Sequence, residues 1–240
     1  MIARVVGAPS FLIPGAFDSC TLAVGVAAAG GGPIALISNT AAGSSDSGNS
    51  VTTGSIDTSG ASLLVVVLAD YSLETISVIT DSKSNTWTPL TSSTSAFTRC
   101  TIFYVANPTV GTGHTFTATK AVNPTFPTIC VASFSNVATT TPFDQQNGAN
   151  SNAATSLSTG SITPTENDEV LIAGLCIEDP ETLSINGGFT ITNQVSHLVD
   201  QHFGGGMAYL IQTTAAAANP AWSWTDSVGC SARIASFKNA

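Results

Sequence analysis

Charged side chains are scarce in this 240-residue sequence. Only 9% of its residues are Asp, Glu, Lys or Arg, against roughly 25% in an ordinary globular protein. Six Lys and Arg residues are outnumbered by fifteen Asp and Glu, so the net charge at pH 7 is −9. Binding to a phosphate backbone or to an anionic membrane requires clustered Lys and Arg. The few scattered basic residues therefore argue against nucleic acid and membrane surfaces as partners.

Long apolar runs, paired cysteine motifs and helical periodicity are also missing. No segment approaches the ~20 unbroken apolar residues that a membrane-spanning helix needs. The five cysteines stand singly, without a CxxC pair or a metal-finger spacing, at Cys20, Cys100, Cys130, Cys176 and Cys230. Free Cys is among the most buried residue types, so we expect small buried hydrophobes here rather than disulfides.

Short β-type runs separated by turn signals fill the rest of the chain. Residues 63–68 read Leu-Leu-Val-Val-Val-Leu, a continuous run typical of a strand covered on both faces. Residues 81–85 predict a turn, because Asp, Ser and Asn are frequent in turns. Further strands are expected over 99–106, 114–119, 128–134, 207–212, 221–225 and 232–237. Ten or more short strands without helical patterns predict an all-β protein, a jelly-roll-like β-sandwich.

An internal repeat organises these strands. Residues 53–56, Thr-Gly-Ser-Ile, recur as residues 159–162 at an offset of 106, and this offset also aligns Phe103 with Tyr209 and Phe116 with Trp222. After a three-residue shortening, residues 131–136 align with 234–239. We therefore predict a duplication within a β-sandwich over 51–240, with repeat one over 51–149 and repeat two over 150–240.

Residues 1–50 precede the repeats as an extended N-terminal arm or as extra strands. Within them, 33–38 predicts one short strand and 41–50 a low-complexity loop. We favour a single sandwich in which the repeats interleave, because residues 138–155 join them without a Pro-rich or charged spacer. Two small sandwiches in tandem are the alternative.

No reactive side chain is shared by the two repeats. The Asp-Ser-Gly triplet at residues 46–48 has no second copy, as an aspartic protease would require. His197 and His202 flank Asp200, but a zinc site would need a further ligand. A Ca²⁺ site built from loop oxygens is an alternative at the acidic residues that follow two strands, Asp70, Glu74, Glu178, Asp179 and Glu181. We expect no enzyme activity, no catalytic residue, no metal and no cofactor.

Aromatic residues carry the best alternative function. Trp222 and Trp224 are two positions apart and would point to the same face of a strand. Trp222 aligns with an aromatic residue of the other repeat, which favours core packing. If exposed, aromatic side chains could stack on sugar rings, and the candidates for such glycan stacking are Trp87, Tyr71 and Trp224.

The sequence resembles β-sandwich proteins of tailed phages and of bacterial secreted proteins. The resemblance rests on residues 54–67 (GSIDTSGASLLVVV), 81–90 (DSKSNTWTPL) and 106–111 (ANPTVG), and on the Ala-Ser-Phe strands. It covers residues 50–240, and its motifs are structural. It implies a capsid decoration (cement) protein or a virion appendage, a class that generally lacks catalytic residues and bridges capsid subunits, commonly as trimers.

Our leading prediction is a capsid decoration protein on the virion surface, assembled in the host cytoplasm. Its partners would be the major capsid protein and further copies of itself, with a trimer favoured. An apolar N-terminal docking arm would contact the capsid through Val5, Val6, Phe11, Leu12 and Phe17. The alternatives are a phage tail or fibre component and a secreted carbohydrate-binding β-sandwich module.

Overall fold

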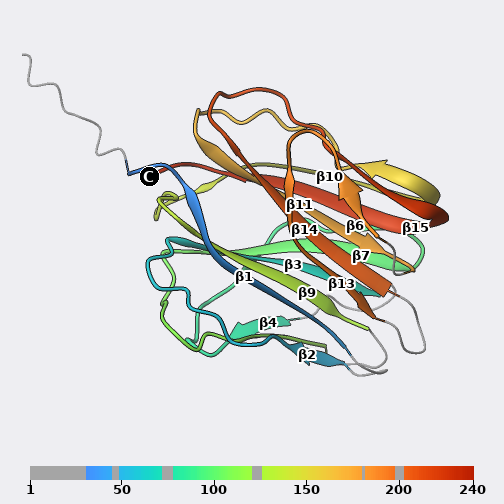
Figure 1. Ribbon diagram of the computed structural model, residues 1–240, viewed down its shortest axis with the longest axis horizontal. Coiled ribbons are helices and arrows are strands. Elements are labelled where there is room, and N and C mark those ends of the chain that lie inside the picture. The colour runs from blue at the N-terminus through green and yellow to red at the C-terminus, as the bar shows by residue number, and fades with distance from the viewer. Residues whose placement is uncertain (1–30, 45–48, 72–77, 121–125, 180–181, 198–202) are drawn as a thin grey trace, which may run out of the picture.

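Fifteen β-strands make up the described part of the chain, with no helix among them. The computed structural model describes residues 31–44, 49–71, 78–120, 126–179, 182–197 and 203–240. Within these ranges, no helix is long and apolar enough to cross a membrane. The strands pair in antiparallel sheets that pack face to face, so the predicted all-β sandwich class is confirmed (Figure 1).

The strands before residue 136 form two sheets. The first-half sheet contains, in order across the sheet, β1 (Ala35–Gly43), β9 (Thr128–Ser135), β3 (Leu63–Tyr71), β7 (Thr98–Ala106) and β5 (Thr88–Pro89), with β6 (Ser93–Thr94) also on β7. A small sheet lies outside it and contains β2 (Ser50–Thr52), β8 (Phe116–Thr119) and β4 (Val78–Asp81). The short strand expected over 33–38 is therefore β1, a paired member of the main sheet, and it continues to Gly43.

The strands after residue 142 form the second-half sheet. Its order is β10 (Phe143–Ser158), β15 (Ala221–Phe237), β11 (Glu169–Ile177), β14 (Phe203–Gln212) and β13 (Thr190–His197), with β12 (Ser184–Ile185) also on β15. The expected junction over 138–155 is thus largely the 16-residue strand β10. The two strands expected over 221–225 and 232–237 are one continuous strand, β15. The halves do not interleave, because each large sheet takes its strands from one half of the chain.

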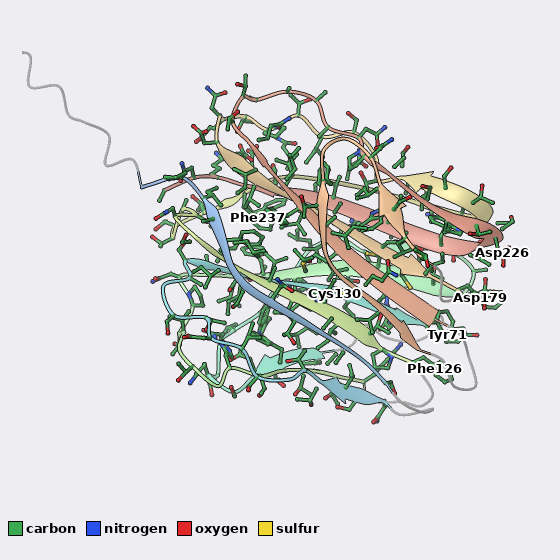
Figure 2. All side chains as sticks on the ribbon, viewed as in Figure 1. Tyr71, Phe126, Cys130, Asp179, Asp226 and Phe237 are labelled. Carbon is green, nitrogen blue, oxygen red and sulfur yellow. The ribbon has the colours of Figure 1, made fainter. Side chains whose placement is uncertain are left out.

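Three apolar cores hold the layers together. The inner core lies between the two large sheets and includes Val65, Val67, Ile172, Phe134 and Phe237; Figure 2 shows Cys130 and Phe237 between these sheets. A first outer core lies between the first-half sheet and the small sheet around Phe116. A second outer core covers the far face of the second-half sheet around Trp222. Strands β3 and β11 are buried on both faces, as their continuous apolar runs predict.

The two large sheets have the same internal pairing. Leu64 lies opposite Val105 in the first, and Leu171 lies opposite Leu210 in the second. Strand β1 contacts β13, β6 contacts β10, and β3 contacts β11 across the inner core. The edge strand β1 thus faces the opposite edge of the second-half sheet, and the central strands β3 and β11 face each other. Two sheets related by an approximate twofold axis would be arranged in this way. The duplication itself stays a prediction, and this pairing supports it.

The pairing places some counterparts differently from the 106-residue offset. Ile79 lies opposite Ala118, and Ile185 lies opposite Trp222, so the counterpart of Trp222 is Ala118 rather than Phe116. In the central strands Tyr104, rather than Phe103, corresponds to Tyr209, since Val65 and Ile172 are their respective partners. A difference of one residue matters because adjacent side chains of a strand point to opposite faces.

A buried arginine ties the two large sheets together. Arg233 of β15 donates hydrogen bonds from Nη2 to Gln146 Oε1 (2.6 Å) and from Nη1 to Ser93 Oγ (3.3 Å). Its side chain passes over Gly148, where an added Cβ would lie 2.3 Å from Nη1. Gly174 serves a similar purpose, because a Cβ there would lie 2.8 Å from Val67 Cγ1. Glycine at these two positions therefore allows the sheets to approach closely.

Candidate functional site

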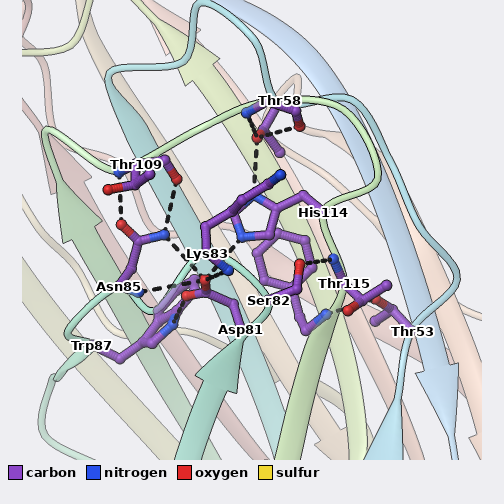
Figure 3. A network of polar contacts seen from close by, with 12 residues as sticks. Thr53, Thr58, Asp81, Ser82, Lys83, Asn85, Trp87, Thr109, His114 and Thr115 are labelled. Atoms are coloured by element: carbon purple, nitrogen blue, oxygen red, sulfur yellow. Dashed lines mark hydrogen bonds and ion pairs between the residues drawn. The ribbon is translucent and has the colours of Figure 1, made fainter.

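The richest polar cluster surrounds Asp81, at the end of β4 in the first half (Figure 3). Its carboxylate is fully buried. Oδ1 accepts hydrogen bonds from Lys83 N (2.8 Å) and Asn85 Nδ2 (3.2 Å), and Oδ2 accepts one from Trp87 Nε1 (2.7 Å). The predicted turn over 81–85 is therefore present, and the carboxylate of its first residue organises it.

His114 extends this cluster toward a hydroxyl group. Its Nε2 lies 3.0 Å from Asp81 Oδ1, and its Nδ1 lies 2.9 Å from Thr58 Oγ1. The imidazole also stacks on Phe116, with ring centroids 4.3 Å apart. A carboxylate, an imidazole and a hydroxyl in this order are the group types of a hydrolase triad. Sequence analysis missed this constellation, because the three residues are far apart in the chain and match no short motif.

Burial prevents this constellation from acting as a triad. Thr58 and His114 are both 0% exposed. The Thr58 hydroxyl also donates to Gly111 O (3.2 Å) and accepts from Gly111 N (3.1 Å). A nucleophilic hydroxyl must reach a substrate carbonyl, and this one is enclosed by its own loops. The cluster instead joins three loops, around residues 58, 81–87 and 109–114, which close the first outer core.

A second polar cluster lies at the end of β3. Arg99 forms a bidentate pair with Asp70, from Nε to Oδ1 (2.8 Å) and from Nη2 to Oδ2 (2.6 Å). Lys120 Nζ lies 3.7 Å from Asp70 Oδ2 and donates to Tyr71 O (3.1 Å). Two cations therefore already neutralise the carboxylate that the Ca²⁺ alternative required. Across the described residues, no group of three or more His, Cys, Asp or Glu side chains is placed to hold a metal ion.

A third cluster lies where β11 begins and β15 ends. Asp144 of β10 accepts hydrogen bonds from Thr165 N (2.8 Å) and Oγ1 (2.7 Å), and Lys238 Nζ lies 2.9 Å from Glu166 Oε1. Burial raises the pKa of Glu169, and the nearby Asp144 contributes to the same direction. Burial opposes ionisation of Asp144 too, but the hydrogen bonds from Thr165, together with those of Glu169 and the charge of Lys238, outweigh it and lower the pKa of that carboxyl.

The four described cysteines are free and buried, as predicted. Burial raises the pKa of the Cys100 and Cys130 thiols to about 12 and that of Cys230 to about 11. The same cause raises the pKa of Cys176 well above its usual value. A thiol is nucleophilic as a thiolate, so these four residues are inert. Cys20 lies outside the described residues.

The three glycan-stacking candidates belong to three different cores. Trp224 is 8% exposed, packs in the second outer core and donates from Nε1 to Ala154 O (3.0 Å). Trp87 is half-buried against the first outer core, with its Nε1 engaged by Asp81. Tyr71 is half-buried against the inner core. The structure therefore does not bring them together as one platform.

An exposed aromatic pair that sequence analysis missed lies beside Tyr71. Phe97 is 44% exposed and stacks on Tyr71 at a centroid distance of 6.2 Å and an interplanar angle of 10°. Phe203 meets Tyr71 edge-on at 5.8 Å from the inner side. The edge of the molecule where Tyr71 lies also carries Asp179 and Asp226 (Figure 2). Of this pair, the sequence indicated only Tyr71 as a candidate. Phe97 lies beside it because β3 pairs with β7.

The remaining candidates lie outside the described residues. They are the five docking-arm residues Val5, Val6, Phe11, Leu12 and Phe17, together with Glu74, Glu181, Asp200 and His202. No protein-family model matches this chain, and no curated protein or solved structure matches it either.

Proposed function

We propose that the protein is a non-enzymatic structural protein of a virion, a capsid decoration protein that binds the outer surface of the major capsid protein. The observation that carries this proposal is the burial of the protein's reactive side chains among the described residues. Asp81, His114 and Thr58 are buried together, with His114 hydrogen-bonded to Thr58 and 3.0 Å from the Asp81 carboxylate, and the described thiols are buried, which raises their pKa values. What faces outward is mainly neutral strand and loop surface, suited to contact rather than chemistry.

The charge distribution supports binding to a protein surface. Of the five Lys and Arg residues in the described ranges, Arg99, Lys120 and Arg233 are at most 6% exposed. The outward charge is therefore mostly acidic, which disfavours nucleic acid and anionic lipid. A protein partner with neutral or basic contact surface fits it better. The buried free thiols are compatible with assembly in the reducing host cytoplasm.

Truncation of the N-terminal segment tests this proposal. Strand β1 begins at Ala35 and pairs with β9, and Gly31 N donates to Ala240 O (3.1 Å). A deletion that spares the fold must therefore end at residue 30. The Δ1–30 protein should keep the melting temperature of the full chain and lose co-sedimentation with particles. A full-length variant with Val5, Val6, Phe11, Leu12 and Phe17 changed to Ser should behave likewise. Undiminished binding by both proteins would contradict the docking-arm role.

A carbohydrate-binding module is the second candidate, and the stacked pair of Phe97 and Tyr71 favours it. An exposed aromatic face can stack on a sugar ring, and a half-buried neighbour would hold it in place. Phe97→Ala should then remove affinity for oligosaccharides in a glycan-binding assay while leaving the melting temperature nearly unchanged. Trp224→Ala serves as the contrasting variant, because its burial predicts a loss of stability instead. A tail or fibre role, the third candidate, would show as a low copy number per particle.

A further inference from the structure

Three buried oxygen atoms in the second half lack hydrogen-bond partners among the described residues. They are Glu169 Oε2, Ser236 Oγ and Gln212 Oε1. Glu169 and Ser236 are both 0% exposed. Most buried polar side-chain atoms in native proteins have a partner, and an exception calls for a bound water or ion.

Strand pairing places these three oxygens together on one face of the second-half sheet. Glu169 of β11 lies directly opposite Gln212 of β14, and residues directly opposite share a face. Ser236 of β15 lies opposite Leu171, and Glu169, two residues before Leu171, points to the same face as Leu171. The three residues therefore lie side by side on neighbouring strands, at the end of the second outer core that contains Leu171.

Asp144 brings a second carboxylate to this corner of the sheet. It belongs to β10, the next strand beyond β15, and its side chain is 7% exposed. Burial raises the pKa of Glu169, the nearby Asp144 adds to this effect, and the Ser236 hydroxyl opposes it. Asp144 and Ser236 are therefore close to the Glu169 carboxyl, although neither Glu169 Oε2 nor Ser236 Oγ has a partner in hydrogen-bonding geometry.

The ammonium group of Lys238 does not neutralise this corner. Its Nζ lies 2.9 Å from Glu166 Oε1 and 3.8 Å from Asp144 Oδ1. With Glu169 ionised, three carboxylates and one ammonium group leave a net charge of −2. A buried carboxylate is costly without a compensating positive charge.

The matching corner of the first-half sheet is satisfied by its own side chains. Ser133 lies opposite Leu64 as Ser236 lies opposite Leu171, so Ser133 is the counterpart of Ser236. Ser133 Oγ donates to Ser38 O (3.1 Å) and accepts from Ser38 N (3.1 Å). The edge strand β1 thus completes this serine in the first half, while β10 offers Asp144, whose oxygens accept from Thr165.

We propose that this corner of the second-half sheet binds one Ca²⁺ ion through the carboxylates of Glu169 and Asp144. The Ser236 hydroxyl and the Gln212 amide oxygen would be further ligands. Ca²⁺ accepts carboxylate and neutral oxygens together in flexible geometry, whereas Mg²⁺ demands a near-ideal octahedron. A buried water molecule would satisfy the three unpaired oxygens but would leave the net negative charge in place.

Two carboxylates and two neutral oxygens make up this ligand set. It therefore differs from a group of three or more His, Cys, Asp or Glu side chains, which the described ranges do not contain. The site is independent of the decoration role, because its ligands all come from one chain and none belongs to the N-terminal arm.

Calcium titration of the full chain tests the site. Isothermal titration with CaCl₂, after removal of metal by a chelator, should show one ion bound per wild-type chain. The melting temperature should be higher in Ca²⁺ than in EDTA, because an ion that binds only the folded state stabilises it. Glu169→Gln keeps the side-chain size and removes the charge, so it should raise the Kd for Ca²⁺ about tenfold or more.

Two controls separate loss of the ligand from loss of the fold or of surface charge. In EDTA, Glu169→Gln should melt no lower than the wild type, because its amide avoids the burial of a carboxylate. Glu166→Gln is the matched variant: it removes the same charge three residues away, from a side chain that is 56% exposed. Calcium binding by Glu166→Gln should be nearly unchanged.

Ser236→Ala removes a neutral ligand without altering the charge, and should weaken Ca²⁺ binding less than Glu169→Gln does. A wild type that binds no Ca²⁺, or binding that both Glu169→Gln and Ser236→Ala leave intact, would overturn the site. Equal weakening by Glu169→Gln and Glu166→Gln would also overturn it, since that result indicates general attraction to acidic surface. None of these results bears on the decoration role, which is measured on particles.

Discussion

Each half of the chain covers the outer face of its large sheet, but the two halves do so in different ways. In the first half, a separate sheet of β2, β8 and β4 covers the main sheet and is held by the Asp81–His114–Thr58 cluster. In the second half, β15 runs unbroken from the main sheet into the outer layer, and Trp222 fills the space beneath.

Counterpart positions of the two halves differ in the same way. Ile56 pairs with His114 as Ile162 pairs with Ala218, so an alanine stands in the second half where the first half has the imidazole. Trp222 stands where the first half has Ala118, and its indole fills the volume there. The second half therefore covers its large sheet without a carboxylate–imidazole–hydroxyl cluster. The Asp81–His114–Thr58 cluster in one outer layer and the large apolar side chain of Trp222 in the other both hold the layer against its large sheet.

Removing the indole should have the largest effect. Trp222 is 0% exposed, and its counterpart in the other half is already alanine with a different filling around it. Trp222→Ala should lower the free energy of unfolding by about 3–5 kcal/mol, because it leaves a cavity that the layer cannot fill. Urea denaturation followed by circular dichroism measures this change.

Trp222→Phe is the control for volume. The Trp222 Nε1 has no hydrogen-bond partner, so phenylalanine loses some packing but removes an unpaired buried donor. Its loss should stay below about 1.5 kcal/mol. A loss for Trp222→Ala no larger than that of the phenylalanine variant would contradict the volume-filling role.

Removing the Asp81 carboxylate from the Asp81–His114–Thr58 cluster should have the second-largest effect on stability. Asp81→Ala leaves Trp87 Nε1 without its acceptor and removes the carboxylate beside the buried His114, at a cost of about 2–4 kcal/mol. The change is confined to the first half, so hydrogen exchange should speed up in β2, β8 and β4 and remain slow in β15. Equal acceleration in both outer layers would show that the two closures are not independent.

The two large sheets differ at one buried position, and this difference should make the stability of the protein depend on pH. Glu169 Oε1 accepts from Glu166 N (3.1 Å), while the counterpart position in the first half holds Ser62, whose Oγ accepts from Val137 N (2.8 Å). The pKa of Glu169 is raised by burial, so the folded state holds this proton more tightly than the unfolded state. Stability from this group is then present below the usual Glu pKa and is lost as pH rises through the folded value.

Glu169→Gln should therefore stabilise the protein at neutral pH, and the gain should vanish near about pH 3, where Glu is protonated in both states. Thermal unfolding at both pH values measures the difference. A gain that is equal at both values would assign it to packing instead of ionisation.

Thiol labelling should give the smallest effect. Cys20 is removed by Cys20→Ser so that only the four buried thiols remain. Because burial raises their pKa values, a maleimide reagent at neutral pH should label none in the folded protein and all four in urea. Fast labelling of the folded protein would mean that the inner core, which holds Cys100, Cys130 and Cys176, or the second outer core, which holds Cys230, opens more readily than its packing indicates.

The sequence predicted the elements that carry an apolar signal and missed those that do not. Strands β3, β7 and β9 were expected close to their observed bounds, because β-branched runs between turn residues are distinctive. β10 reads Phe-Asp-Gln-Gln-Asn-Gly-Ala-Asn onward and lacks apolar alternation, since an edge strand of this kind buries little on either face. The continuity of β15 had no such signal: with Ala118 as the counterpart of Trp222 and Ala132 as that of Ala235, the second half is only one residue shorter over this stretch.

The candidate site was less predictable than the fold. The turn at Asp81 was expected from its residue types, but its link to Thr58 and His114 depends on the pairing of β4 with β8 and on the bridge between Ile56 and His114. Likewise, Trp224 was open to either exposure or burial until the second outer core placed it. Contacts between residues distant in the chain leave no local signal.

The copy number of this chain in purified particles tests the central claim most directly. Gel densitometry against the major capsid protein gives the ratio. A decoration protein with its reactive groups enclosed should be present in hundreds of copies per particle. Its absence from the particles would contradict the virion role and would leave the exposed Phe97–Tyr71 pair, as a glycan-binding surface, as the remaining explanation.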